Sequence, residues 1–360
     1  MKKPSFTMIK QAGTSVKWAA AVGTLAVILT ACGGGDTAAT SNSGATNSPA
    51  AANQAEGAAS SAPVASETAT NAGEALVTPE QLPKALLAGD YTGIYERFSA
   101  SFKGQVSEAD FIKMAESFMS GVKSLENTSI LNKGGAEQRT WVSDSGTKGI
   151  VGVFDMEGTI VGLQVKDLTP ATETDSLLTK NSYSLPFRGE WLVIWGGNNV
   201  LVNYHYEYES QRYAYDFVQA KDGNSYEGDP LKNESYFAFG QEILAPADGT
   251  VVSVVNDIAD NEPVGVMNEK APAGNVVVID HGGEYSYLAH MKKGSATVKA
   301  GDKVTKGDVI GLTGNSGNSS EAHLHFQLSD GDDLFTSKAI AVKWEGGIKP
   351  IQGETIGSAE

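Results

Sequence analysis

The strongest constraint on the fold is an alternating histidine motif near the C-terminal end of the chain. Residues 311–328 read GLTGNSGNSSEAHLHFQL, so a glycine- and serine-rich loop leads directly into His323-Leu324-His325-Phe326. Such alternation predicts a β-strand, on which side chains two positions apart share one face. His323 and His325 are therefore expected to project together, while Leu324 and Phe326 face a core. Two imidazoles held on one rigid face suit a metal site.

The same pair would also fit two histidines on an ordinary polar surface. The distribution of histidine favours a metal site, because the chain has only five histidines in 360 residues and all lie between positions 205 and 325. Histidine is a common zinc ligand, and catalytic zinc sites combine three protein ligands with one open position. Metal chemistry is therefore expected in the C-terminal part of the chain.

Charge and length restrict the class of protein. The formal net charge is −16 at pH 7, whereas a nucleic-acid-binding protein would present a basic face, so no nucleic-acid partner is expected. The length of 360 residues allows two domains, and a hydrophobic content of 41% allows each of them to bury a core.

Residues 1–31 are predicted to be a lipoprotein signal peptide. The chain begins with a segment that contains lysines and no acidic residue. An apolar run follows at positions 18–30, which is too short to span a bilayer comfortably. The sequence LTAC at positions 29–32 resembles the bacterial lipobox, whose cysteine becomes the lipid-carrying N-terminus. This resemblance implies an extracytoplasmic lipoprotein of the bacterial cell envelope, anchored to the membrane through Cys32. An ordinary secretory signal with an unrelated cysteine is the alternative.

Two further segments follow the signal. Residues 32–76 consist of Ala, Ser, Thr, Gly and Asn with almost no large apolar residue, and such a segment is predicted to be a disordered tether. Cys32 is the only cysteine, so no intramolecular disulfide can form. Residues 77–168 are predicted to form a small α+β domain.

The small domain is predicted because the spacing of apolar residues changes from a helical period to a strand period within it. Capping signals at Thr78 and Ser107 predict helices, and the sequence after Gly134-Gly135 predicts strands at 138–143, 149–155 and 159–166. The helices and strands are similar to small cystatin-like domains attached to other extracellular bacterial proteins. That similarity implies a spacer, docking or binding module. The segment has no histidine or cysteine, so enzymatic chemistry is not expected there.

Residues 169–182 are predicted to be a linker, and residues 183–348 an all-β domain with antiparallel sheet. Few stretches of this second domain have a helical period. Its predicted strands lie at 190–197, 200–208, 213–219, 250–256, 275–280, 284–290 and 309–312.

Five ordered motifs in residues 183–345 resemble the lysostaphin-like (LytM-type) zinc endopeptidases, which cut peptidoglycan peptides. The motifs lie at 245–252 (APADGTVV), 278–283 (VIDHGG), 287–290 (YLAH), 304–311 (VTKGDVIG) and 314–326 (GNSG through HLHF). The resemblance implies an all-β metallopeptidase domain that holds one Zn²⁺ per chain and acts on peptidoglycan peptides.

The resemblance also implies residue roles. His325, the second histidine of the His-x-His pair, is expected to bind zinc, and His323 is expected to be a catalytic histidine beside the metal. His290, at the end of the YLAH motif, is expected to be the other catalytic histidine. Asp216 in the sequence YAYDF is expected to be a second ligand.

The third ligand departs from the family pattern. The family places a histidine four residues before the aspartate, but position 212 is arginine. His205 is the only histidine upstream of Asp216, and it is expected to take the role, with residues 206–212 as an inserted turn. A hairpin of two adjacent strands would bring His205 and Asp216 face to face.

Several other polar residues have two interpretations. His281 follows a predicted strand, and a structural role is favoured over a catalytic one. Solvated surface carboxylates are favoured over general bases for Glu207, Glu209, Glu284 and Glu321. Groove lining and packing within the sheet both remain open for Tyr204, Tyr206, Tyr208, Tyr213 and Tyr215.

The sequence therefore predicts a zinc-dependent endopeptidase that hydrolyses peptide bonds of peptidoglycan at the cell envelope. The alternative is a catalytically inactive protein of the same fold that binds peptidoglycan or regulates another cell-wall hydrolase. A solute-binding lipoprotein would need two α/β lobes, which the pattern of residues 183–345 does not predict. The residues select neither a particular peptidoglycan bond nor an oligomeric state.

Overall fold

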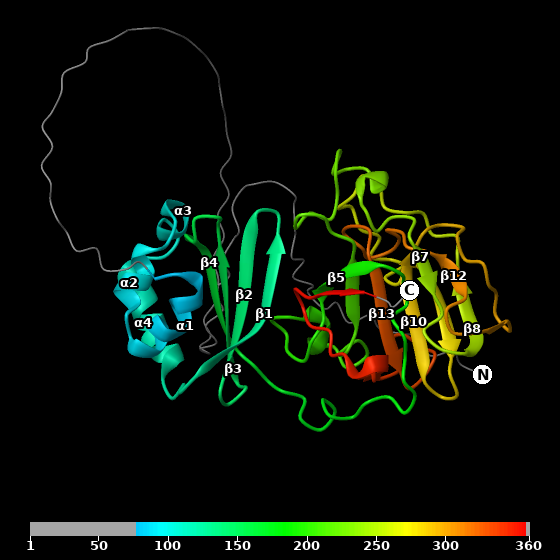
Figure 1. Cartoon of the computed structure of the whole chain (residues 1–360), viewed down its shortest axis with the longest axis horizontal. Helices are drawn as coiled ribbons and strands as arrows, with labels where there is room; N and C mark the ends of the chain where they lie inside the picture. Colours follow the sequence, from blue (N-terminus) through cyan, green and yellow to red (C-terminus); the bar gives the residue numbers. More distant parts are fainter. Residues whose placement is uncertain (1–76, 358–360) are drawn as a thin grey trace, which may run out of the picture. The chain divides into compact units, whose positions relative to one another are not determined.

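The computed structural model describes residues 77–357 (Figure 1). The predicted signal peptide, the tether and Cys32 lie outside these residues. None of the helices in the described range is long and apolar enough to cross a membrane. Residues 77–168 are called the small domain below, and residues 183–357 the C-terminal domain.

The small domain consists of short helices followed by a four-stranded antiparallel sheet. Its helices are η1 (Pro79–Gln81), α1 (Leu82–Ala88), α2 (Tyr91–Glu96), α3 (Ala100–Lys103) and α4 (Glu108–Met119). Its strands, in spatial order, are β1 (Leu125–Lys133), β2 (Ala136–Ser143), β3 (Lys148–Phe154) and β4 (Ile160–Asp167). Strand β1 was not among the predicted strands, whereas the other three lie within two residues of prediction. The similarity to cystatin-like domains stays a prediction.

Side-chain caps fix where the helices begin. The Ser107 hydroxyl accepts a hydrogen bond from the main-chain N–H of Asp110, which confirms the predicted start of α4. The helices lie together on one side of the strands (Figure 1). They bury apolar side chains against that face of the sheet, and the core includes Leu82, Ile94, Phe111, Trp141, Ile150 and Phe154.

The C-terminal domain is rich in antiparallel sheet, as predicted. A nine-stranded sheet has the order β11-β8-β9-β10-β13-β6-β5-β15, with β14 paired to β13, and β12 pairs with β7 in a second sheet. The strands are β5 (Glu190–Trp195), β6 (Tyr215–Val218), β7 (Glu242–Leu244), β8 (Gly249–Val255), β9 (Asn275–Asp280), β10 (Tyr285–Met291), β11 (Lys303–Val304), β12 (Val309–Leu312), β13 (Leu324–Ser329), β14 (Ala339–Ile340) and β15 (Thr355–Gly357). Three 3₁₀-helices are η2 (Tyr204–Glu207), η3 (Asn233–Ser235) and η4 (Glu345–Gly347).

Alternation along the central strands gives the large sheet two different faces. On β13, Leu324 and Phe326 enter the main core, which also receives Ile243 from β7 and Ile310 from β12. The opposite face carries His325, as the period of two requires. This opposite face is called the site face below.

The strand predicted at 200–208 is wrong. This stretch consists of turns and η2. The side chain of Asn203 accepts a hydrogen bond from the main-chain N–H of His205 and so begins the 3₁₀-helix. An asparagine that bonds its own backbone competes with strand pairing, and here it overrides the strand propensity of the valines and tyrosines around it.

The small domain contacts the site face of the C-terminal domain. Leu131 of β1 packs against Leu192 and Ile194 of β5 and against Val218 of β6. The hydroxyl of Ser129, also on β1, donates a 2.8 Å hydrogen bond to the carbonyl of Gln352. The contact therefore joins buried apolar and buried polar groups.

The predicted linker is bound along the C-terminal domain. Asp175 accepts hydrogen bonds from the hydroxyls of Tyr206 at 2.9 Å and Tyr213 at 2.9 Å. The main-chain N–H of Thr179 bonds the carbonyl of Ala341 at 2.9 Å. The linker therefore follows a fixed course over the C-terminal domain.

We expect Leu131→Ala to lower the free energy of unfolding by about 2–3 kcal/mol, because it leaves a cavity at the contact between the domains. Ile130→Ala is the matched control, since the Ile130 side chain is 39% exposed and its loss should cost no more than about 0.5 kcal/mol. Denaturant unfolding of the two variants measures the difference. Equal losses would show that the contact contributes nothing to stability.

Candidate metal centre

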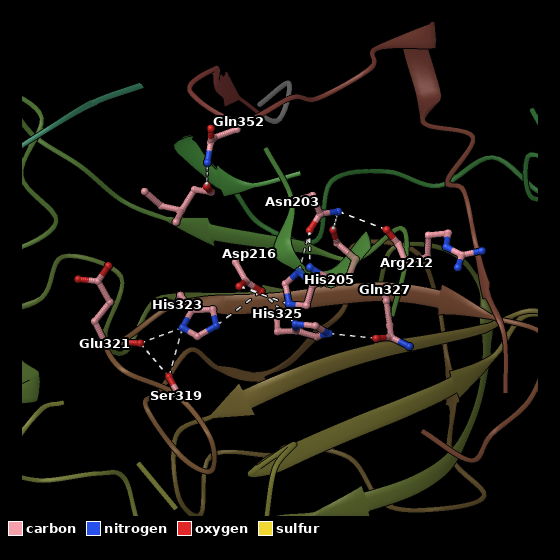
Figure 2. Close-up of polar contacts among 12 residues, drawn as sticks. Asn203, His205, Arg212, Asp216, Ser319, Glu321, His323, His325, Gln327 and Gln352 are labelled. Carbon is pink, nitrogen blue, oxygen red and sulfur yellow. Dashed lines mark hydrogen bonds and ion pairs between the residues drawn. The ribbon is translucent and has the colours of Figure 1, made fainter. Parts of the chain in front are cut away.

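Three side chains from separate elements converge on the site face. His205 comes from η2, Asp216 from β6 and His325 from β13, and one ligand atom from each lies within 4.8 Å of the others. His325 and Asp216 are direct partners in the pairing of β13 with β6, which places their side chains on one face (Figure 2). The three residues are 0%, 4% and 5% exposed, respectively. The structure thus brings together the three residues predicted as ligands.

His205 reaches this position from a 3₁₀-helix and not from the predicted hairpin strand. Its Nε2 lies 3.6 Å from Asp216 Oδ2, and its Nδ1 lies 2.9 Å from Asn203 Oδ1. The amide nitrogen of Asn203 donates to three main-chain carbonyls, so its oxygen must face His205. The proton of His205 therefore lies on Nδ1, and the lone pair of Nε2 points at the centre.

The tautomer of His325 is fixed in the opposite sense. Its Nε2 lies 3.1 Å from Gln327 Oε1, and the amide nitrogen of Gln327 is committed to Ser210 O and Ser329 Oγ. Nε2 therefore carries the proton. The lone pair of His325 Nδ1 faces Asp216 Oδ1 at 2.9 Å. Two hydrogen-bond acceptors therefore face each other, which is unfavourable unless a positive charge lies between them.

The electrostatics of the centre favour a cation. Burial lowers the pKa of His205 to about 3, so this imidazole is neutral and able to act as a ligand. Burial also tends to lower the pKa of His325, but the adjacent Asp216 outweighs burial and raises it. For Asp216, burial raises the pKa, but the surrounding histidines outweigh burial and lower it. The site therefore holds a buried negative charge that attracts a proton or a metal ion.

The donor set fits a divalent metal ion. His205 Nε2 is buried and has no hydrogen-bond partner among the described residues, which is a costly state for a polar atom. Two neutral imidazoles and a carboxylate are a known set of ligands for catalytic zinc. A cation bound by these three atoms would satisfy the lone pair of His205 and separate His325 from Asp216.

Two further histidines flank the three ligand candidates. The ring of His290 lies 4.8 Å from that of His323 and 5.7 Å from that of His325, measured between centroids. His323 Nε2 lies 3.6 Å from Asp216 Oδ1, and both flanking histidines are at most 9% exposed. The predicted catalytic pair therefore lies beside the predicted ligands.

Both flanking histidines use Nδ1 for a hydrogen bond to the main chain. Nδ1 of His290 bonds the carbonyl of Ser316 at 2.8 Å, and Nδ1 of His323 bonds the carbonyl of Glu321 at 2.8 Å. A carbonyl can only accept, so each Nδ1 carries a proton and each Nε2 has a free lone pair. Burial and the nearby His323 lower the pKa of His290 well below its ordinary value, which keeps its ring neutral.

His290 is held in an unusual backbone conformation. Its φ is +59°, a region that costs a residue with a side chain about 1 kcal/mol or more. The pairing of β10 with β9 shifts register between Leu288 and Met291. Simple alternation along β10 would place His290 on the core face, together with Leu288. At the register shift the side chain of His290 instead lies beside the other histidines.

Arg212 and His281 take no part in the centre. Arg212 Nε donates a 3.2 Å hydrogen bond to the carbonyl of Tyr206. His281 Nδ1 lies 2.8 Å from Asp248 O and its Nε2 lies 2.9 Å from Ser286 Oγ. Both ring nitrogens of His281 are therefore occupied by hydrogen bonds within the domain. This agrees with the structural role that the sequence favoured.

The prediction of solvated carboxylates is wrong for two of the four glutamates. Glu284 is 4% exposed and accepts a 2.9 Å hydrogen bond from the hydroxyl of Tyr183. Glu321 has a side chain that is 19% exposed and lies 2.6 Å from Lys133 Nζ. These partners lie more than 100 residues away in sequence, so no local pattern could reveal them. Glu207 and Glu209 are exposed, as predicted.

The tyrosines divide between the two interpretations. Tyr206 and Tyr213 are buried in a cluster with Ala339 and Ala341, so they pack. Tyr204 is 45% exposed, and its ring lies 3.9 Å from the ring of His205. Tyr204 is thus the tyrosine placed to border the centre.

The residues that fix the histidine tautomers were not among the predicted site residues. Gln327 could have been found, because alternation places it on the same face of β13 as His325. Asn203 lies two residues before His205, but its role depends on η2, where a strand was predicted. The carbonyls of Ser316 and Glu321 carry no sequence signal, since every residue has one.

Comparison with known proteins gives a family match for one part of the chain. Residues 235–336 match the model of peptidase family M23. This range contains His290, His323 and His325, whereas His205 and Asp216 precede it.

Curated relatives match about a quarter of the chain. A stretch of 91 residues is 48% identical to the peptidoglycan DD-endopeptidase ShyA of Vibrio cholerae and covers 24% of this chain and 20% of that protein. A stretch of 89 residues is 38% identical to an uncharacterized metalloprotease of Haemophilus influenzae and covers 25% of this chain and 16% of that protein. The match thus spans about a fifth or less of the length of these relatives.

A solved structure is also similar. The catalytic domain of lysostaphin from Staphylococcus simulans matches at 19% identity and a TM-score of 0.24, over 47% of this chain and 92% of that chain.

We expect His205→Ala to weaken zinc binding by more than about 100-fold, because it removes one of three ligands and should exceed the effect of losing an outer-shell partner. His281→Ala is the matched control, since His281 takes no part in the centre. Competition with a chelating indicator measures both affinities. Wild-type affinity in His205→Ala, or an equal loss in His281→Ala, would contradict the ligand set.

Proposed function

We propose that this chain, which carries a peptidase family M23 domain at residues 235–336, is a zinc-dependent endopeptidase that hydrolyses peptide bonds of bacterial peptidoglycan. One observation carries the proposal. The lone pairs of His205 and His325 and the carboxylate of Asp216 are directed at one point, with the free Nε2 atoms of two further histidines beside it.

The arrangement supports hydrolysis without a protein nucleophile. His205, Asp216 and His325 would hold the zinc ion. When bound, zinc supplies a Lewis acid that polarises the scissile carbonyl and lowers the pKa of water. The buried site around these residues excludes bulk water, which strengthens electrostatic interactions with the developing oxyanion.

The two flanking histidines would move the proton. His323 Nε2 is free and lies 3.6 Å from Asp216 Oδ1, so it is placed to accept a proton from the attacking water. The proton can then pass from Nε2 to the leaving amine, since Nδ1 of His323 keeps its own proton in the bond to Glu321 O. Neutral His290 can play the same part from the other side or orient the substrate carbonyl after protonation.

The substrate class and the location belong to the same proposal. The relative from Vibrio cholerae that is 48% identical over 91 residues is a peptidoglycan DD-endopeptidase, which supports peptidoglycan peptides as the substrate. The lipobox-like LTAC sequence at positions 29–32 supports an extracytoplasmic lipoprotein anchored through Cys32.

The inactive alternative depended on arginine at position 212, where the family has a ligand histidine. His205 offers an imidazole nitrogen 3.6 Å from Asp216 in place of that ligand. The departure at Arg212 therefore no longer favours an inactive protein.

We expect zinc-loaded protein to release muropeptides from purified peptidoglycan and to lose this activity in a chelator. His323→Ala should lower kcat by roughly 100- to 10,000-fold, which is the usual contribution of a general acid–base residue. His281→Ala should stay close to wild type. Chromatography of the released fragments measures all of these. If wild type releases nothing and His323→Ala behaves identically, a binding or regulatory role replaces the enzymatic one.

We expect cells to incorporate labelled palmitate into the wild-type protein and none into Cys32→Ala. The reason is that the substitution removes the thiol that would carry the lipid, and the remaining chain has no other cysteine. Fluorography of the immunoprecipitated proteins measures the label. Equal labelling of the two proteins would exclude lipidation at Cys32.

A further inference from the structure

The loop that leads into His323 is held by a residue of the small domain. Lys133, at the end of β1, has its Nζ 2.6 Å from Glu321 Oε1. The second carboxylate oxygen of Glu321 accepts a 2.9 Å hydrogen bond from the hydroxyl of Ser225. Burial raises the pKa of Glu321, but Lys133 and Ser225 outweigh burial and lower it. The carboxylate is thus ionised and held from two sides.

The main chain of Glu321 holds the imidazole of His323. The carbonyl of Glu321 accepts a 2.8 Å hydrogen bond from His323 Nδ1 and another of 2.8 Å from the hydroxyl of Ser319 (Figure 2). The side chain and the carbonyl are joined through one Cα, so a shift of the main chain at Glu321 moves both. The position of the Glu321 side chain therefore bears on the orientation of the His323 ring.

The hairpin that carries Lys133 is fixed to the C-terminal domain. The main-chain N–H of Gly134 donates a 3.1 Å hydrogen bond to the carbonyl of Gly223. A Cβ at Gly223 would lie 3.3 Å from Asn132 O, so the two backbones approach closely there. Leu131, two residues before Lys133, packs against β5 and β6.

The pair of Lys133 and Glu321 differs from the other lysine–glutamate pairs of the surface. The Glu321 side chain is 19% exposed, whereas both members of the Lys306–Glu345 pair are more than 40% exposed. Exposed pairs contribute little because water and salt screen them. An unpaired carboxylate at the partly buried position of Glu321 would instead gain by turning towards water.

We propose that Lys133 is a positioning residue for His323, which it orients by holding Glu321, and that the small domain thereby completes the active centre. This inference rests on the proposed function where it is tested by measuring activity. Lys133 touches neither the ligand candidates nor the lone pair of His323, so its effect passes through Glu321. Loss of Lys133 frees the Glu321 side chain, loosens the carbonyl that binds Nδ1 and lets the His323 ring turn away from the centre.

The test uses the full zinc-loaded chain with Lys133→Met, Lys133→Arg and Lys306→Met. We expect Lys133→Met to lower kcat by roughly 10- to 100-fold, the loss that a small misplacement of a catalytic group produces. KM and zinc content should stay as in wild type. Lys133→Arg keeps the positive charge and should recover most of the activity. Lys306→Met removes an exposed lysine that pairs with Glu345 and not with Glu321, so it should have no effect.

A double substitution separates positioning from a direct role. Glu321→Gln should lower kcat about as much as Lys133→Met, and the two changes together should cost little more than either alone, because they break one link. Additive losses would overturn the proposal. A loss confined to KM would also overturn it, since Lys133 would then act on the substrate.

A spectroscopic readout keeps this inference separate from the proposed activity. The Nδ1 proton of His323 should give a slowly exchanging downfield NMR signal that is identified by its absence in His323→Ala. We expect Lys133→Met to broaden or remove that signal and Lys306→Met to leave it unchanged. A wild type without activity that still shows this difference would refute the proposed function and retain the positioning role. An unchanged signal in Lys133→Met would refute the positioning role itself.

Discussion

The buried carboxylate of Asp216 is the constraint on which the site depends. It is 4% exposed, and imidazole nitrogens of His205, His323 and His325 lie within 3.6 Å of its oxygens. None of these nitrogens carries a proton in the neutral tautomers, because the other nitrogen of each ring is the donor. A buried negative charge that faces three acceptor nitrogens is unfavourable, and a divalent cation removes the conflict. Metal binding would therefore stabilise this part of the fold as well as supply chemistry.

The tautomers are preset by acceptors that cannot readily change. For His290 and His323 the acceptor is a main-chain carbonyl, which has no donor form. For His205 and His325 it is an amide oxygen, whose orientation follows from the bonds of the amide nitrogen. Each ring thus has the protonation pattern that a ligand or a proton acceptor needs before any cation or substrate binds, so little reorganisation of the rings would be required.

The sequence predicted the parts of the site that depend on alternation along one strand. His325 lies on the face opposite Leu324 and Phe326, as the period of two requires. His205 lies beside Asp216 as predicted, but the strand predicted around it is wrong. Apolar and aromatic residues favour a strand at 200–208, whereas Asn203 bonds the backbone and starts a 3₁₀-helix. The burial of Glu321 could not be predicted, because it depends on Lys133, which lies 188 positions away.

The site face links the small domain to the metal centre through one short strand. Asp216 and Val218 are two positions apart on β6 and point to the same side. Asp216 pairs with His325, while Val218 packs with Leu131 of the small domain. A displacement of β6 would disturb both contacts, so the two are not energetically independent. The small domain therefore packs against the same short strand that carries Asp216, although it does not line the centre itself.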